Sequence, residues 1–337
     1  MIGIGRDFRG LLGLTALGLA LALGVGGCGL PVSSFPTPSE PLVQALWVWS
    51  ASGAMDGPLG RQTLIERSAA SGVNVLLMSL YRSTPNASGR LLYEDAEIAD
   101  LVARAHAEGI EVWATYGAPD WPALGCDPGA FPLRRMDDVI GYNRDRPTAP
   151  LDGVMLDVEP PEPLSGGDYQ ALLALYECLQ DVLRAEGIAM GVAIRFFWDD
   201  PVEYPAGSGR VKPAYQHVLD VVSGPVGVMG YRDFAGRACP DEGIVCLDQE
   251  EVFYASRVGG SVWVGLETGG CAPGCGPEKV TFFEEGQDAL NREAANVVDS
   301  FRNEAGFAGF AVHAYKDAYL SGLPRWPTTN PGFPQSR

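Results

Sequence analysis

Residues 152–159 read Asp-Gly-Val-Met-Leu-Asp-Val-Glu and are followed directly by two prolines. Side chains of a strand alternate between its two faces, so the Val, Leu and Val of this segment share one face. Asp157 and Glu159 share the other face with Met155. An apolar face of this kind is typical of a strand covered by helices. Carboxylates at its end are costly to desolvate, and they persist where they are hydrogen-bonded, solvated in a cleft or used in chemistry. A salt-bridged or strand-capping pair is the structural alternative.

The same strand-then-helix unit recurs along the chain. Eight apolar segments predict strands, and they are Ala45–Trp49, Val73–Leu80, Ile110–Tyr116, Gly153–Glu159, Ile188–Phe196, Val226–Tyr231, Ser261–Glu267 and Gly309–Ala314. Apolar residues at helical spacing predict the helices between them, which are Leu64–Ala70, Glu94–Glu108, Leu133–Tyr142, Asp168–Glu186, Ala214–Val222, Leu247–Arg257 and Gln287–Glu304. Several of these helices end in a glycine just before the next strand, as expected of helix C-caps.

Eight alternating units without an antiparallel hairpin signal predict a single (β/α)8 barrel, a TIM barrel, over residues 43–337. An open doubly wound sheet is the alternative, but no Gly-x-Gly-x-x-Gly follows an early strand. The loops after the expected strands are long and polar. In a barrel, these loops build the active-site face.

The N-terminal segment has the features of an export signal. Residues 1–27 contain two arginines ahead of an apolar run that is short and Gly-rich for a membrane-spanning helix. The run ends at Cys28 in a pattern that resembles the bacterial lipobox, whose cysteine is lipidated; an ordinary cleaved signal is the alternative. Residues 28–42 are rich in Pro and Ser and predict a flexible tether. We therefore expect an exported protein, anchored by lipid alone to a bacterial membrane and facing its extracytoplasmic side.

Six cysteines follow Cys28, and an even number in an exported chain favours disulfides over zinc. Cys239–Cys246 and Cys271–Cys275 each bracket a short Pro/Gly loop, which leaves Cys126–Cys178 as a pair by elimination. The three histidines are scattered, so we expect neither a metal nor a cofactor. The net charge of −18 argues against binding of nucleic acid, or of an anionic membrane by the domain itself, and suits a neutral substrate.

Aromatic and polar side chains gather at the ends of the expected strands. Aromatic faces stack on pyranose rings, while carboxylates and arginine hydrogen-bond sugar hydroxyls, so the pattern predicts a carbohydrate site. The expected substrate-binding residues are Trp47, Trp49, Tyr81, Tyr116, Arg195, Trp198, His313 and Tyr315. Structural alternatives remain for some of them: the two tryptophans could be barrel core, the arginine could neutralise a carboxylate, and the histidine could be a hydrogen-bonded residue of the barrel mouth.

Glycoside cleavage requires an acid and usually a second carboxyl group as nucleophile or base. Glu159 is the expected acid, because it ends a strand beside a carboxylate with which it can share a proton. In one arrangement Asp157 shares that proton and the N-acetyl group of the substrate attacks. In the other, Glu267 across the barrel is the nucleophile and Asp157 only orients. Glu267 could instead cap the Gly-rich loop that follows it.

Two motifs carry a resemblance to a known family. Asp152-Gly-x-x-x-Asp157-x-Glu159 resembles the Asp-Gly-x-Asp-x-Asp-x-Glu signature of family 18 glycoside hydrolases, the chitinase-like barrels. Met229-Gly-Tyr231-Arg-Asp resembles the Met-x-Tyr-Asp segment of that family. The resemblance implies that Glu159 is the acid, that Asp157 is its partner, and that Tyr231 stabilises the oxazolinium ion.

The chain departs from that family at three points of the site, one of which is the extra residue between Tyr231 and Asp233. Met155 stands where the signature has its middle Asp, and His313 stands on the last strand in place of a characteristic Trp. Separately, the glutamates that end the fourth and seventh strands resemble the acid and nucleophile of clan A retaining glycosidases, which usually have Asn where this chain has Val158. We therefore expect a glycoside hydrolase acting on a polysaccharide or glycan at the cell envelope. A non-catalytic carbohydrate-binding barrel lipoprotein is the alternative that Met155 keeps open.

Overall fold

The computed structural model describes residues 42–49, 52–236, 239–270 and 278–315, all within the compact unit Phe35–Arg337. The expected export signal, Cys28 and nearly all of the tether lie outside the described residues, as do Cys271 and Cys275.

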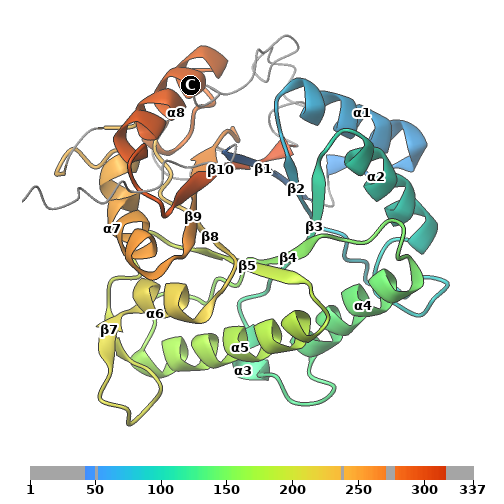
Figure 1. The fold of residues 1–337 in the computed structure, drawn as a ribbon, viewed down its shortest axis with the longest axis horizontal. Coiled ribbons are helices and arrows are strands. Elements are labelled where there is room, and N and C mark those ends of the chain that lie inside the picture. Colours follow the sequence, from blue (N-terminus) through green and yellow to red (C-terminus); the bar gives the residue numbers. More distant parts are fainter. Residues whose placement is uncertain (1–41, 50–51, 237–238, 271–277, 316–337) are drawn as a thin grey trace, which may run out of the picture. The chain divides into compact units, whose positions relative to one another are not determined.

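Eight parallel strands close into a barrel in the order β1-β10-β9-β8-β5-β4-β3-β2 (Figure 1). Their bounds are β1 Val43–Val48, β2 Val75–Met78, β3 Glu111–Tyr116, β4 Gly153–Leu156, β5 Ala189–Ile194, β8 Pro225–Val228, β9 Ser261–Glu267 and β10 Phe307–His313. Each expected strand is present, and the predicted (β/α)8 barrel is confirmed. The first and last strands pair directly, so residues far apart in the chain meet where the barrel closes.

Helices surround the ring of strands (Figure 1). Their bounds are α1 Gly57–Ala70, α2 Asp95–Ala107, α3 Trp121–Leu124, α4 Phe131–Asp145, α5 Gly166–Ala185, α6 Ala214–Val221, α7 Ile244–Val258 and α8 Gln287–Phe301, with a short 3-10 helix at Glu278–Val280. Within the described ranges, no helix combines the length and the hydropathy needed to cross a membrane.

The long loops contain two elements that the sequence did not predict. The loop after β5 folds into an antiparallel pair, β6 (Pro201–Glu203) with β7 (Val211–Pro213), although no hairpin was expected. Each strand is only three residues long and has a proline at one end, which is too short to show an alternating pattern. The single turn α3 is likewise shorter than any helical periodicity can reveal.

Strand side chains separate into two apolar layers, as their alternation requires. One layer packs between strands and helices, and the other fills the barrel interior around Trp113, Met155 and Trp263. Glycines make room for these large side chains: a Cβ on Gly153 would lie 2.5 Å from the Trp113 ring, and one on Gly191 would lie 2.9 Å from the Met155 sulfur. Met155 is fully buried, so the floor of the barrel mouth is apolar.

Two of the expected disulfides lie within the described residues, and both are confirmed. Cys126, just after α3, bonds Cys178 of α5. Cys239 bonds Cys246 at the start of α7. Both bridges tie a loop on the carboxyl side of the barrel strands to an outer helix, which braces the face that carries the candidate site.

Candidate active site

The carboxylates of Asp157 and Glu159 lie just beyond the last residue of β4, on the same face as Met155. The amide of Asp157 continues the strand pairing by donating to the carbonyl oxygen of Tyr116 at 2.8 Å. Gly117 is required at this point, because a Cβ there would lie 1.6 Å from the carbonyl oxygen of Asp157. The close approach of the chain after β3 to the chain after β4 therefore fixes the backbone at Asp157.

Asp157 is held in a protonatable state. Burial, followed by the charge of Glu159, raises its pKa from 3.8 to about 6, while His313 when protonated and then Arg195 oppose the shift. Its Oδ1 is buried and has no hydrogen-bond partner among the described residues. A carboxyl group in these surroundings holds a proton near neutral pH more readily than an exposed aspartate does.

Glu159 is the more accessible member of the pair, with its side chain 40% exposed. Its Oε2 accepts a hydrogen bond from Arg195 Nε at 3.1 Å. Arg195 also donates to Glu162 Oε1 at 3.0 Å and to the carbonyl oxygen of Pro160 at 3.3 Å. The arginine thus fixes the segment after β4 and neutralises part of its charge, which was the structural alternative considered for it.

A hydrogen-bonded relay runs along one side of the barrel mouth, from Trp49 after β1 through His313 of β10 to Glu267 of the adjacent β9. Trp49 Nε1 donates to His313 Nε2 at 2.8 Å, and His313 Nδ1 lies 2.8 Å from Glu267 Oε2. An indole nitrogen can only donate, so Nε2 of the histidine accepts and its proton is on Nδ1. In this arrangement the imidazole donates from Nδ1 to the glutamate.

Glu267 is engaged at both carboxylate oxygens. Oε2 accepts from His313, and Oε1 accepts from the amide of Gly269 at 2.6 Å. Its side chain is only 17% exposed. The loop-capping alternative is present in the structure, and the carboxylate has less freedom to approach a sugar than Glu159 has.

Tyr231 stands among the three carboxylates of the mouth. Burial raises its pKa well above the usual value, and the charges of Glu267, Asp157 and Glu159 add to the shift. The hydroxyl therefore keeps its proton and remains a hydrogen-bond donor. Its ring packs where β9 has Gly265, on which a Cβ would lie 2.7 Å from the ring. The ring centre of His313 is 6.3 Å away, so the relay and the tyrosine belong to one site.

Of the expected sugar-binding aromatics, Trp49 and Trp47 lie at the mouth and just beneath it. Their ring centres are 5.4 Å apart and nearly parallel. Trp47 is only 5% exposed and belongs to the barrel interior, so it supports Trp49 from below.

Four other expected residues lie elsewhere. Tyr116, Trp198 and Tyr315 are buried in the layer between strands and helices, and they cannot present a ring to a sugar in this conformation. Trp198 instead donates from Nε1 to Glu162 Oε1 at 3.3 Å. Tyr81 is exposed, but its ring packs edge-on against Phe131 beside α4.

Two polar residues of the site were not anticipated. Glu162 forms an ion pair with Arg195, as Glu159 does. The only sequence feature that pointed to Glu162 is its position directly after the two prolines that follow Glu159. Thr115 is paired with Met155 in the strand register, and its buried Oγ1 has no hydrogen-bond partner among the described residues. Thr115 is two residues after Trp113 on the same strand, so strand alternation predicts that its side chain points into the barrel interior. In the part of the chain that the structure describes, no group of three or more His, Cys, Asp or Glu side chains could hold a metal ion.

The sequence matches no family model and no curated protein. Solved structures with a similar fold include a chitinase from Bacteroides thetaiotaomicron, with a TM-score of 0.53 and 14% identity over 83% of this chain and 93% of that chain. A GH18 chitinase from Pseudoalteromonas aurantia has a TM-score of 0.52 and 13% identity over 83% of this chain and 97% of its own.

A plant class V chitinase mutant from Cycas revoluta, solved in complex with (GlcNAc)3, has a TM-score of 0.51 and 12% identity over 81% of this chain and 94% of its own. At such identities the likeness concerns the fold alone. It confirms the predicted resemblance to chitinase-like barrels at that level.

Proposed function

We propose that this protein is a glycoside hydrolase that cleaves a glycan rich in N-acetylhexosamine, with Glu159 as the general acid. The observation that carries the proposal is the pairing of an accessible glutamate with a protonatable aspartate two residues earlier, both at the mouth of the barrel. The likeness to chitinases in fold, including one solved with (GlcNAc)3, supports this substrate class.

The proposed reaction uses the proton that Asp157 and Glu159 share. Asp157, whose pKa is about 6, passes it to Glu159, and Glu159 delivers it to the glycosidic oxygen as the bond to C1 breaks. The carbonyl oxygen of the substrate's N-acetyl group bonds to C1, and the hydroxyl of Tyr231 supports that group by donating a hydrogen bond. Water then adds at C1 as the bond from C1 to the acetyl oxygen breaks. Its extra proton returns to the Asp157–Glu159 pair, and the sugar is released with its configuration retained.

This substrate-assisted route is favoured over attack by Glu267. Both oxygens of Glu267 already accept hydrogen bonds, from His313 and from Gly269. A nucleophilic carboxylate would have to leave at least one of them to form a bond to C1. We therefore propose that Glu267 positions His313 and the wall of the mouth.

The test is hydrolysis of fluorescently labelled N-acetylglucosamine oligomers by the wild type and by Glu159→Gln. The variant is expected to lose at least about a hundredfold in kcat while it still binds the oligomer. Glu186→Gln is the matched control, because Glu186 also accepts from one arginine, Arg144, but lies at the end of α5. If wild type and Glu159→Gln bind equally and neither releases product, the hydrolase proposal fails and a carbohydrate-binding barrel takes its place.

The proposed place of action is the outside of a bacterial membrane. The support is the sequence before the barrel, with its apolar run ending at Cys28. Replacing Cys28 by Ala is expected to move the protein from the membrane fraction to the soluble fraction of the cell envelope. An unchanged membrane fraction would contradict the lipid anchor and leave the hydrolase proposal untouched.

A further inference from the structure

A second cavity opens beside the barrel mouth, between the loops that follow β1 and β2. Its volume is about 340 Å³, within the range of small-ligand sites. Both loops leave the carboxyl ends of their strands, so the cavity is on the same face of the barrel as Glu159. We call it the rim pocket, and its lining includes Asp56, Arg82, Thr84, Tyr93, Glu94 and Glu97.

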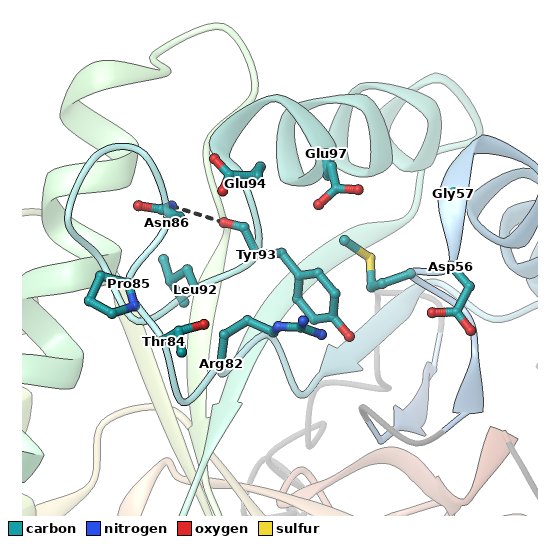
Figure 2. Close-up of a pocket in the computed structure, with 11 residues that line it drawn as sticks. Asp56, Gly57, Arg82, Thr84, Pro85, Asn86, Leu92, Tyr93, Glu94 and Glu97 are labelled. Atoms are coloured by element: carbon teal, nitrogen blue, oxygen red, sulfur yellow. Dashed lines mark hydrogen bonds between the residues drawn. The ribbon is translucent and has the colours of Figure 1, made fainter.

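The side chain of Tyr93 reaches into the rim pocket. Tyr93 is 9% exposed, and its hydroxyl makes no hydrogen bond to any described residue. Figure 2 shows its ring between Arg82 and the first turn of α2, at the centre of the lining residues. The hydroxyl oxygen is not one of the buried polar atoms that lack a partner, so it is open to the pocket and can donate to and accept from a ligand.

Arg82 completes one wall of the pocket. Its guanidinium carbon lies 4.8 Å from the centre of the Tyr93 ring, and it forms no salt bridge with any residue in the described ranges. The guanidinium therefore has donors available, held in place by the ring beneath it.

Carboxylates line the opposite side. Asp56, Glu94 and Glu97 face Arg82 across the pocket in Figure 2. Glu97 Oε1 also lies 3.7 Å from Arg61 Nη1, and the carboxylate in this ion pair can still accept a hydrogen bond. Acceptors opposite a donor suit the hydroxyl groups of a sugar, whereas the excess of carboxylates repels an acidic one.

The loop that carries Asp56 begins at Trp49, the indole of the mouth relay. The amide of Ser52 donates to the Trp49 carbonyl oxygen at 2.9 Å, which turns the chain from the mouth toward α1. The described ends of this loop thus lie at the mouth, at Trp49, and at the rim pocket, at Asp56. A glycan lying over this loop would contact both.

We propose that the rim pocket is a second carbohydrate-binding site, which holds an uncharged unit of a glycan outside the barrel mouth. Tyr93 and Arg82 donate to ring and hydroxyl oxygens, and the three carboxylates accept from hydroxyl groups. The site does not depend on turnover by Glu159. It would increase the time that a long glycan spends on the protein without changing the chemistry at the mouth.

The experiment is calorimetric titration of the Glu159→Gln protein, which leaves the oligosaccharide intact. The probes are the N-acetylglucosamine tetramer and, as an acidic comparison of equal length, the galacturonate tetramer. Tyr93→Phe removes only a hydroxyl and is expected to weaken binding of the neutral tetramer at one site by about three- to tenfold. Arg82→Met is expected to weaken the same site by at least about tenfold.

Arg184→Met is the matched control, since Arg184 is an exposed arginine on α5 that is paired with Asp181. It should leave both sites unchanged. The proposal would be overturned if Tyr93→Phe, Arg82→Met and the parent protein bound the neutral tetramer with equal affinity. It would also be overturned if the galacturonate tetramer bound and both substitutions weakened its binding as much as they weaken that of the neutral tetramer. If the wild type hydrolyses no glycan yet the rim-pocket variants lose a binding event, the proposed function fails and the second site stands.

Discussion

Replacing Asp157 by Asn is expected to stabilise the fold, and to do so only where the wild-type carboxyl is ionised. Burial and Glu159 raise the pKa of Asp157 from 3.8 to about 6. Between these two pH values the folded protein binds more protons than the unfolded chain, so the free energy of unfolding falls as pH rises. Above about pH 6 the decline ends, because both states have then lost the proton.

The size of the effect follows from the same pKa. The pKa of the Asp157 carboxyl rises from 3.8 to about 6 on folding. Each unit of pKa shift corresponds to 1.36 kcal/mol, so the ionised carboxylate destabilises the folded state by about 3 kcal/mol. The amide that replaces the carboxyl in the variant carries no such cost. The variant should therefore match the wild type near pH 4 and exceed it by up to about 3 kcal/mol near pH 7.5.

Urea unfolding followed by tryptophan fluorescence, at pH values from about 4 to 7.5, measures this difference. Asp137→Asn serves as the control, because Asp137 is exposed on α4 and also loses one negative charge. It should show no comparable rise with pH. A stability gain of Asp157→Asn that is the same at every pH, or a loss near pH 7.5, would refute the electrostatic reasoning. The same variant should hydrolyse glycan more slowly, which is a trade of stability against function.

Three further predictions concern the scaffold and the relay. Replacing both Cys126 and Cys178 by Ala removes a disulfide between residues 52 positions apart. Because the unfolded chain then gains conformational freedom, the free energy of unfolding measured in urea titrations should fall by about 4 kcal/mol. Met155→Ala should cost about 2–5 kcal/mol by the same measurement, because it leaves a hole in the barrel interior; a cost below about 1 kcal/mol would mean that the interior collapses around it. Trp49→Phe should lower kcat by up to about a hundredfold and alter the pH–rate profile, because the indole no longer donates its hydrogen bond to His313 Nε2. An unchanged profile would contradict the relay.

The barrel and its main carboxylates could be predicted because both follow from the period of a strand. Alternation fixed which face carries Asp157 and Glu159, and strand order brought them to the mouth. The same alternation directs Tyr116 to the outer face of β3, opposite to Thr115. Tyr116 accordingly packs between strands and helices, where it cannot contact a sugar at the mouth.

Residues beyond the strand ends could not be placed in this way. Trp198 and Tyr315 follow β5 and β10, where the local path of a loop, rather than any period, decides the direction of a side chain. The relay from Trp49 to Glu267 was equally hidden. Its partners come from β1, β9 and β10, and the sequence gives no measure of the distance between them.

The hydrogen bond between Trp49 and His313 joins residues 264 positions apart, on the strands that close the ring. A nascent chain emerges from its N-terminus onward, so it contains Trp49 long before it contains the histidine. During synthesis the mouth therefore lacks one wall, and the relay forms only after nearly the whole barrel sequence has been released. A chain truncated before β10 would be inert for this reason, even if most of its helices had formed.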